Sequence, residues 1–189
     1  MKNNGVLFII SGPSGCGKGT IVNQLIERNS DIFISVSATT RQPRAGEVDG
    51  KSYHFITAEE FERLASNDGF LEYAGYCENR YGTPKKAVDD AMQSGRDVIL
   101  EIEVQGALQV KAKRPDAVLI FILPPSVEEL ERRLRKRASE TEDKVQKRLA
   151  KANDEMKLVG LYDYSVVNDA LEDAVVDVES IMRAEHLRN

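Results

Sequence analysis

Four short runs of apolar residues stand out along the chain, at 6–10, 98–102, 117–123 and 164–167. The first three are rich in Val, Ile, Leu or Phe and show no clean alternation with polar residues. Continuous apolar runs of this length are typical of parallel strands that are buried on both faces. We therefore expect a central parallel sheet.

Helical spacing of apolar residues appears between these runs. On one face of residues 18–28 the apolar positions are Ile21, Val22, Leu25 and Ile26. Further helices are predicted over 84–93, 126–137, about 142–159 and 171–187. Because strands alternate with helices, the pattern predicts an α/β fold with a parallel sheet.

Residues that favour helix ends accompany several of these segments. Thr83 is the expected N-cap of the helix at 84–93, with Pro84 at its first position and Gly95 after its end. The sequences at 57–60 and 126–129 both have the spacing of a capping box, and each predicts the start of a helix.

Residues 37–83 differ from the rest of the chain. They contain many turn residues, short predicted elements and most of the aromatic side chains. We interpret this block as a small subdomain inserted into the α/β core.

Composition narrows the possible classes of protein. A length of 189 residues, 41% hydrophobic and 30% charged, is typical of one globular domain. The net charge of −5 argues against general electrostatic binding of nucleic acid. No apolar stretch approaches membrane-spanning length. The two cysteines lack metal-ligand spacing, which favours a reducing cytoplasm.

A glycine-rich loop follows the first apolar run. GPSGCGK, from Gly12 to Lys18, matches the first seven positions of the phosphate-binding P-loop G-x-x-x-x-G-K-[ST]. Glycines let backbone amides converge on phosphate oxygens, and the next helix offers its positive N-terminus. The candidate ATP-binding residues of this loop are Gly12, Pro13, Ser14, Gly15, Cys16, Gly17, Lys18, Gly19 and Thr20.

The eighth position of the loop departs from the motif. Gly19 stands where Ser or Thr holds magnesium, and the hydroxyl comes one residue later at Thr20. The alternative reading is a glycine-rich turn that only joins a strand to a helix. A P-loop alone also does not distinguish a kinase from a GTPase or a transporter ATPase.

A second anion site is predicted within the inserted block. Arg41 and Arg44 are three residues apart in a loop, and Tyr53 adds a hydroxyl nearby in sequence. Two guanidinium groups can hold a phosphate through paired hydrogen bonds. The alternative is a pair of solvated surface arginines.

Several segments, in this order, closely resemble guanylate kinase: SVSATTRQPRAGEVDG, FLEYAGY, RYGTP, LEIEVQGA, RASETED and VVND. The resemblance covers nearly the whole chain. It implies transfer of the γ-phosphoryl group of ATP to GMP, with Mg²⁺, in purine nucleotide metabolism and GMP recycling, and use of dGMP as well. The implied fold is a P-loop core with a parallel sheet, an inserted mixed α+β GMP-binding subdomain and a small mobile lid.

The resemblance also divides the chain into parts. It implies a core at about 1–36, 84–136 and 149–189, a GMP-binding subdomain at about 37–83 and a lid at about 137–148. The small polar segment at 138–144 is read as the tip of the lid.

Roles for single residues follow by position in the resemblance. Four residues would hold the GMP phosphate: Arg41, Arg44, Tyr53 and Tyr81. Three would read guanine: Ser37, Glu72 and Thr83. Glu47 would orient the arginines, and Glu101 would lie near GMP and magnesium. The alternative for Glu72 is a solvated residue at a strand edge.

The transfer step is assigned in the same way. The residues implied to be catalytic are Lys18, Arg41, Arg137 and Arg148. Asn168 and Asp169 match the segment that touches adenine. No direct protein ligand to magnesium is certain, and Thr20 and Glu101 are candidates through water. Glu103 lies two residues further along the predicted strand and so on the same face as Glu101. It could hold magnesium through water as well, or it could be only a polar strand end, and the two readings are equally supported.

The chemistry needs no general base. A phosphate monoester has a second pKa of about 6, so GMP is largely a dianion at neutral pH. In agreement, neither His54 nor His186 lies in a motif. For Arg132, Arg135 and Lys136 we favour a solvated helix end.

Two other functions are alternatives. One is a protein-binding module with the same fold, against which the presence of Lys18, Arg137 and Arg148 argues. The other is a kinase for another nucleoside monophosphate, against which the residues implied to read guanine argue. The expected partners are ATP and GMP, without nucleic acid or membrane, in a cytoplasmic monomer or small homo-oligomer.

Overall fold

The computed structural model describes residues 4–76, 78–136 and 142–188 of the chain. Its main sheet has five strands in the order β2 (Phe33–Ile34), β7 (Val98–Glu101), β1 (Leu7–Ser11), β8 (Val118–Leu123) and β9 (Tyr164–Val167). Every neighbouring pair in this sheet is parallel. The expected parallel sheet is therefore confirmed, with one further short strand, β2, at its edge.

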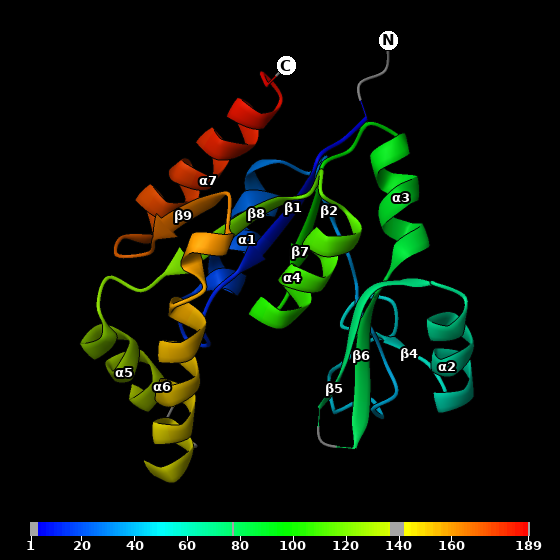
Figure 1. Cartoon of the computed structure of the whole chain (residues 1–189), viewed down its shortest axis with the longest axis horizontal. Coiled ribbons are helices and arrows are strands. Elements are labelled where there is room, and N and C mark those ends of the chain that lie inside the picture. The colour runs from blue at the N-terminus through cyan, green and yellow to red at the C-terminus, as the bar shows by residue number, and fades with distance from the viewer. Residues whose placement is uncertain (1–3, 77, 137–141, 189) are drawn as a thin grey trace.

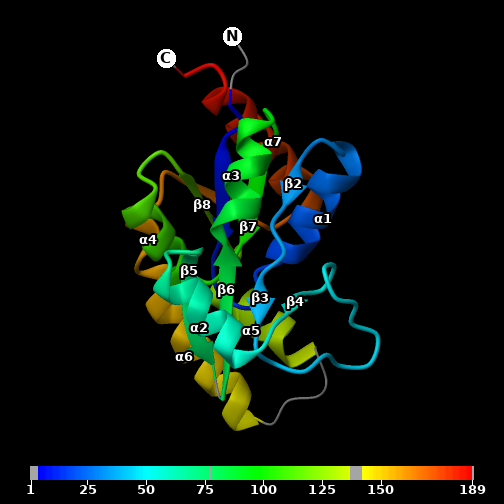
Figure 2. The same ribbon diagram turned by 90° about the vertical axis from the view of Figure 1, so that its right-hand side faces the viewer.

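Helices cover both faces of this sheet (Figure 1 and Figure 2). Phe8 and Ile10 of β1 pack toward α1 (Lys18–Arg28) and α7 (Leu171–Glu185). Leu7 and Ile9, which alternate with them, pack toward α3 (Lys85–Gln93) and α4 (Val104–Lys113). A strand buried on both faces has no need of polar positions, which explains the continuous apolar run at 6–10.

A second sheet lies beyond the carboxyl end of the first (Figure 1). Its strand order is β4 (His54–Phe55), β3 (Ala38–Thr39), β6 (Asn79–Pro84) and β5 (Phe70–Tyr76). Helix α2 (Ala58–Ser66) covers it and buries Phe61 against Phe70 and Ala38. The ring centroids of Phe61 and Phe70 are 4.5 Å apart. The mixed α+β character expected of the inserted block is thus observed.

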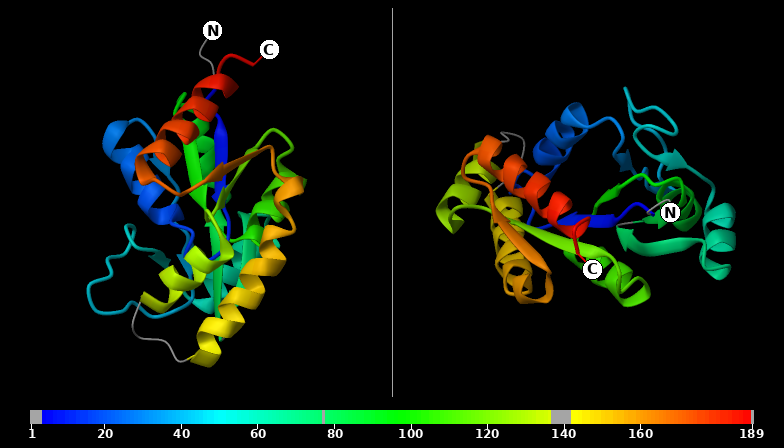
Figure 3. Two further views of the ribbon diagram at one scale, coloured as in Figure 1. Left: turned by 90° about the vertical axis from the view of Figure 1, so that its left-hand side faces the viewer. Right: turned by 90° about the horizontal axis from the view of Figure 1, so that it is seen from above.

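Two helices extend together on the opposite side of the molecule from the second sheet (Figure 1 and left panel of Figure 3). They are α5 (Val127–Lys136) and α6 (Glu142–Met156). Their contact is a small apolar cluster of Leu130, Leu134, Val145, Leu149 and Ala152. Arg137 and most of the predicted lid tip lie outside the described residues.

The helix starts agree with sequence expectations in two places and differ in a third. The Thr57 hydroxyl accepts a hydrogen bond from the Glu60 amide, and Ser126 does the same for Glu129, both at 3.1 Å. Thr83 is not an N-cap. It belongs to β6, and Pro84 holds the N-cap position of α3 without a side-chain cap.

Helix α4 was not expected from the sequence, and α6 is shorter than expected. The α4 segment carries a glycine in its first turn, which weakens a helical pattern. It forms because Val104, Ala107 and Val110 are buried against the sheet. Helix α6 ends at Met156, and a separate short 3₁₀ helix follows at Val159–Leu161.

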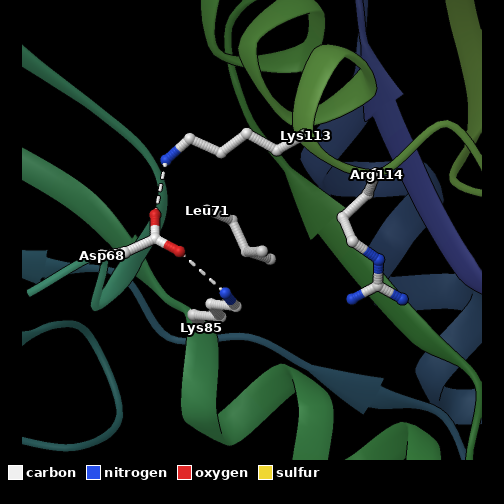
Figure 4. A pocket seen from close by; sticks show the side chains of 5 residues that line it. All are labelled: Asp68, Leu71, Lys85, Lys113 and Arg114. Carbon is white, nitrogen blue, oxygen red and sulfur yellow. Dashed lines mark hydrogen bonds and ion pairs between the residues drawn. The ribbon is translucent and has the colours of Figure 1, made fainter.

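The second sheet is attached to the core through a cluster of charges near α3 and α4 (Figure 4). Asp68 accepts hydrogen bonds from Lys85 at 2.9 Å and from Lys113 at 3.4 Å. Lys113 also donates to the Phe70 carbonyl at 3.0 Å. These groups, with Leu71 and Arg114, line a hollow of about 240 Å³. None of them belongs to the site predicted from the sequence.

Among the helices of the described residues, none is both long enough and apolar enough to cross a membrane.

Candidate functional site

The carboxyl ends of the parallel strands bring distant segments of the chain to one edge of the main sheet. Strand β1 leads into the glycine loop, β7 ends at Glu101, and β9 leads directly into Asn168. In open α/β sheets, ligands bind at this edge. The predicted P-loop therefore lies where the fold favours a nucleotide.

The P-loop wraps closely around its own lysine. The Lys18 ammonium donates to the carbonyls of Gly12 at 2.6 Å and Pro13 at 3.1 Å. Gly17, the N-cap of α1, has a φ of 95°, in the left-handed region that favours glycine. Helix α1 therefore begins directly after the loop. The free backbone amides of its first turn and the positive end of its dipole lie at the predicted phosphate site.

Asn168 holds the loop from the side of β9. Its side-chain amide donates to the Cys16 carbonyl at 2.8 Å, and the residue is only 6% exposed. A Cβ at Gly17 would lie 2.3 Å from that amide nitrogen, so a side chain there would collide with it. Asp169 is exposed. The expected contact of Asn168 and Asp169 with adenine stays a prediction.

Cys16 is buried within the same loop. Burial raises the pKa of its thiol, and the nearby Lys18 charge opposes that shift only in part. The residue therefore contributes its backbone and its packing to the site rather than a thiolate.

Glu101 faces the position at which the loop departs from its motif. A Cβ at Gly19 would lie 3.4 and 3.5 Å from the two carboxylate oxygens of Glu101. Although the side chain as a whole is exposed, desolvation of its carboxyl raises the pKa, and Lys18 lowers it in part. Thr20, which follows Gly19 in the chain, is exposed. A carboxylate and a hydroxyl are oxygen donors of the kind that suits Mg²⁺, which keeps several waters and binds substrate phosphates. By the chemistry of their donor atoms, Glu101 and Thr20 fit the implied ion. Within the described residues, no cluster of three or more acidic, His or Cys side chains forms a metal cage.

The expectation that Glu101 and Glu103 lie on one strand face was wrong. Strand β7 ends at Glu101, and Glu103 is the N-cap residue of α4, so the two glutamates do not share a strand face. Glu103 accepts a hydrogen bond from Lys151 of α6 at 2.7 Å. It links α6 to the core.

Sequence reasoning missed Glu155, which is paired with Lys151 at 3.5 Å. Its side chain is only 13% exposed. Burial raises the pKa of its carboxyl, while the charges of Lys151 and Lys18 lower it. The spacing of four residues between Lys151 and Glu155 is that of an ordinary surface pair, so nothing in the sequence distinguishes them.

Arg41 and Glu47 form the centre of the second predicted anion site. Arg41 donates to Glu47 at 2.8 Å, and the other oxygen of Glu47 accepts the Arg44 amide at 2.8 Å. The Arg41 hydrogen bond, followed by that of the Arg44 amide, lowers the pKa of Glu47. The Arg41 side chain is only 13% exposed, so the alternative of a freely solvated arginine is wrong for this residue.

Aromatic rings support the same arginine. The Arg41 guanidinium lies 5.4 Å from the ring centre of Tyr53, which makes an edge contact with Tyr81 at 5.9 Å. Three of the four residues assigned to the GMP phosphate therefore lie together, whereas the Arg44 side chain is exposed.

Glu72 is a buried carboxylate on β5, the edge strand of the second sheet. It is 8% exposed, and it accepts a hydrogen bond from the Thr83 hydroxyl at 2.6 Å. Burial raises the pKa of Glu72, and the Thr83 hydrogen bond opposes that shift in part. Although β5 is an edge strand, the alternative of a solvated residue is therefore wrong. Ser37, the third residue assigned to guanine, lies next to this sheet and accepts the His54 amide through its backbone.

Helices α5 and α6 bring arginines to the P-loop. Arg148 of α6 donates to the Ser14 hydroxyl at 2.6 Å. Arg133 of α5 binds Glu129 at 2.7 Å and the Asn168 carbonyl at 3.1 Å, a role that the sequence did not indicate. Arg132 and Arg135 instead form ion pairs within the helical pair, as expected of a solvated helix end.

Comparison with known proteins gives a consistent result. The family model described as guanylate kinase matches residues 4–185. The chain is 56% identical over 187 residues to the guanylate kinase of Clostridium perfringens strain SM101, covering 99% of this chain and 87% of that protein. It is 51% identical over 189 residues to the guanylate kinase of Latilactobacillus sakei, covering 100% and 93%.

A solved structure agrees with these relatives. The crystal structure of guanylate kinase from Anaplasma phagocytophilum superposes with a TM-score of 0.78 at 39% identity, covering 100% of this chain and 89% of that one. Because the family model matches residues 4–185 and these relatives align over nearly the whole chain, the chain belongs to the guanylate kinase family.

Proposed function

We propose that this chain transfers the γ-phosphoryl group of ATP to GMP, giving ADP and GDP, and that it does so in the cytoplasm. The donor site is the P-loop. Backbone amides of the loop and the N-terminus of α1 bind the phosphates of ATP, and Lys18 places its charge on the outer phosphates.

The acceptor phosphate binds on the second sheet. Arg41 supplies a guanidinium group that Glu47 and the Tyr53 ring already hold in place. Arg44 and Tyr81 complete the set of donors around the phosphate. Because GMP is largely a dianion at neutral pH, its own oxygen is the nucleophile, and positioning and charge stabilisation carry the reaction.

Glu72 reads the base. Guanine presents N1–H and a 2-amino group side by side as donors, and a carboxylate offers two acceptor oxygens. Adenine lacks both donors and would leave the buried Glu72 carboxylate unpaired. A site built in this way rejects an analogue without the donor by as much as about 10⁴-fold.

Magnesium and the two outer helices complete the proposed site. Mg²⁺, held through water by Glu101 and Thr20, would neutralise charge on the phosphates of ATP. Arg148 reaches the P-loop from α6, and Arg137 is proposed to join it from the lid. Closure of that lid would exclude water, which competes as an acceptor.

The buried Glu72–Thr83 pair is the observation that most supports GMP as the acceptor. A coupled assay with ATP and each of GMP, dGMP, AMP, CMP, UMP and dTMP tests the proposal. We expect turnover with GMP and dGMP only. Comparable rates with AMP would refute the assigned base site.

Lys18→Met tests the donor site. We expect it to remove phosphoryl transfer while the far-ultraviolet circular dichroism and the melting temperature stay close to wild type. Near-normal turnover in the folded variant would contradict the role of Lys18. Wild-type protein that binds GMP but transfers nothing would instead support the protein-binding module.

A further inference from the structure

Helix α4 approaches Glu72 more closely than a residue with a side chain would allow. Gly106 lies in the first turn of α4, directly against the end of the Glu72 side chain. A Cβ at residue 106 would lie 3.0 Å from Oε2 of Glu72, 3.3 Å from Cδ and 3.4 Å from Cγ. Contacts this short are rare for a real Cβ, so Glu72 would have to move by a few tenths of an ångström.

Glu72 has little freedom to move. Its Oε1 accepts the Thr83 hydroxyl at 2.6 Å, while its Oε2 is the oxygen next to Gly106. The residue is 8% exposed. One oxygen is therefore bound by Thr83 of β6, and the other lies close against α4 at Gly106.

The backbone of Gly106 does not itself require glycine. Gly106 is absent from the residues with a positive φ, and it occupies an α-helix, in which alanine is the better helix former. The close approach to Glu72 is thus the structural reason for a residue without a side chain. The first turn of α4 also carries the positive end of the helix dipole, which favours a carboxylate beside it.

We propose that Gly106 is a positioning residue for guanine recognition, since its missing side chain lets α4 hold the Glu72 carboxylate in the register that pairs with N1–H and the 2-amino group. This inference rests on the proposed role of Glu72. A shift of Glu72 would misalign both hydrogen bonds to the base and leave the P-loop unchanged.

The test is Gly106→Ala, assayed with GMP and with IMP, whose base keeps N1–H and lacks the 2-amino group. We expect KM for GMP to rise about tenfold with little change in kcat, which is the signature of lost ground-state binding. The preference for GMP over IMP should shrink by less than that factor, because IMP also loses its N1–H bond, and KM for ATP should stay within about twofold. Equal losses for GMP and IMP, together with a raised KM for ATP, would overturn the proposal.

Gly160→Ala is the matched control, because a Cβ there meets nothing within 4 Å. We expect wild-type kinetics from it. Glu72→Ala separates the inference from the function on which it rests. If Glu72→Ala leaves GMP kinetics unchanged, the proposed base site is wrong; if it impairs GMP while Gly106→Ala does not, only the inference fails.

The double variant Glu72→Ala/Gly106→Ala covers the case in which Gly106→Ala folds poorly. Without the glutamate, alanine at residue 106 has lost its close contact, so the double variant should melt at or above the temperature of Glu72→Ala alone. When Glu72 is already alanine, Gly106→Ala should also cause little further loss of kcat/KM for GMP. A double variant that melts below Glu72→Ala would show a different cause and overturn the proposal.

Discussion

At the scale of single residues, burial changes what a side chain can do. Glu72 and Glu101 are both glutamates near proposed substrate groups, and desolvation raises the pKa of each. Glu72 has a neutral hydroxyl as its partner, whereas Glu101 faces the charge of Lys18. The first arrangement suits recognition of neutral donors on a base, and the second suits a site that handles cations and phosphates.

The raised pKa of Glu72 predicts a pH dependence of GMP binding. As pH falls through this pKa, Glu72 takes up a proton and loses acceptor capacity, so KM for GMP should rise. Because the pKa is raised, this rise should begin at a higher pH than the titration of an ordinary glutamate would give. Because the pKa of Glu72 is raised in the folded state, protonation of this group stabilises the folded protein. The expected rise in KM at low pH therefore does not come from unfolding driven by Glu72. Steady-state KM for GMP between pH 5 and 8 measures the effect.

Glu72→Gln is the control for that measurement. It removes the titrating group but leaves the ionisation of the GMP phosphate itself, which has a pKa of about 6. The difference between the two profiles therefore isolates Glu72. Profiles of identical shape would contradict the prediction.

Gly19→Ser tests the departure of the loop from its motif. The new Cβ would lie 3.4 Å from Glu101, which is an ordinary contact, and serine is tolerated near a helix N-terminus. We expect kcat/KM for ATP to stay within about tenfold of wild type, or about 1.4 kcal/mol. A much larger loss at saturating Mg²⁺ would show that close approach of the Gly19 backbone to phosphate is required.

At the scale of elements, the P-loop is held by segments that are distant in sequence. Asn168, after β9, binds the Cys16 carbonyl, and Arg133 of α5 binds the Asn168 carbonyl in turn. Arg148 of α6 reaches Ser14. The loop conformation therefore depends on both outer helices and on β9, besides its own glycines.

Asn168→Ala should weaken this arrangement. The substitution leaves the Cys16 carbonyl without its side-chain partner, which costs about 1–3 kcal/mol of unfolding free energy. We expect a lower melting temperature and a raised KM for ATP, with KM for GMP nearly unchanged. Calorimetry and separate titration of each substrate measure these effects.

Asp169→Ala is the control for stability, because Asp169 is exposed beside Asn168. It should change the free energy of unfolding by less than about 0.5 kcal/mol. If Asn168→Ala matches it in melting temperature, the Asn168 side chain does not support the loop.

At the scale of the whole molecule, the two proposed substrate sites lie on different sheets. The P-loop belongs to the main sheet, and Arg41, Glu47 and Glu72 belong to the segments of the second sheet. The charge cluster around Asp68 connects the second sheet to α3 and α4 (Figure 4). Each substrate should therefore bind and stabilise the protein without the other.

GMP alone should raise the melting temperature. At a concentration 100 times its Kd, a ligand of the folded state adds about 2.7 kcal/mol, which is about 5–10 °C for a chain of this size. Arg41→Ala should lose this shift and keep the shift caused by ATP with Mg²⁺. Loss of both shifts would contradict separate sites, and retention of the GMP shift would contradict the role of Arg41.

The sequence by itself determined four of the five strands of the main sheet, most of the helices and the position of the P-loop motif. Residues 6–10 and 117–123 are apolar throughout because both of their faces are buried, and the motif from Gly12 to Lys18 is local in the chain. Local patterns of this kind need no knowledge of the fold. The resemblance in FLEYAGY and RYGTP likewise singled out Glu72 and Thr83.

Tertiary structure alone decided the contacts between distant segments. Helix α4 was missed because a glycine weakens its local pattern, and that glycine lies against Glu72, 34 positions earlier in the chain. The pairing of Thr83 with Glu72 and the binding of Asn168 to the P-loop join residues that only folding brings together. These contacts arise from packing and hydrogen bonding across the molecule, and the spacing of residues along the chain does not indicate them.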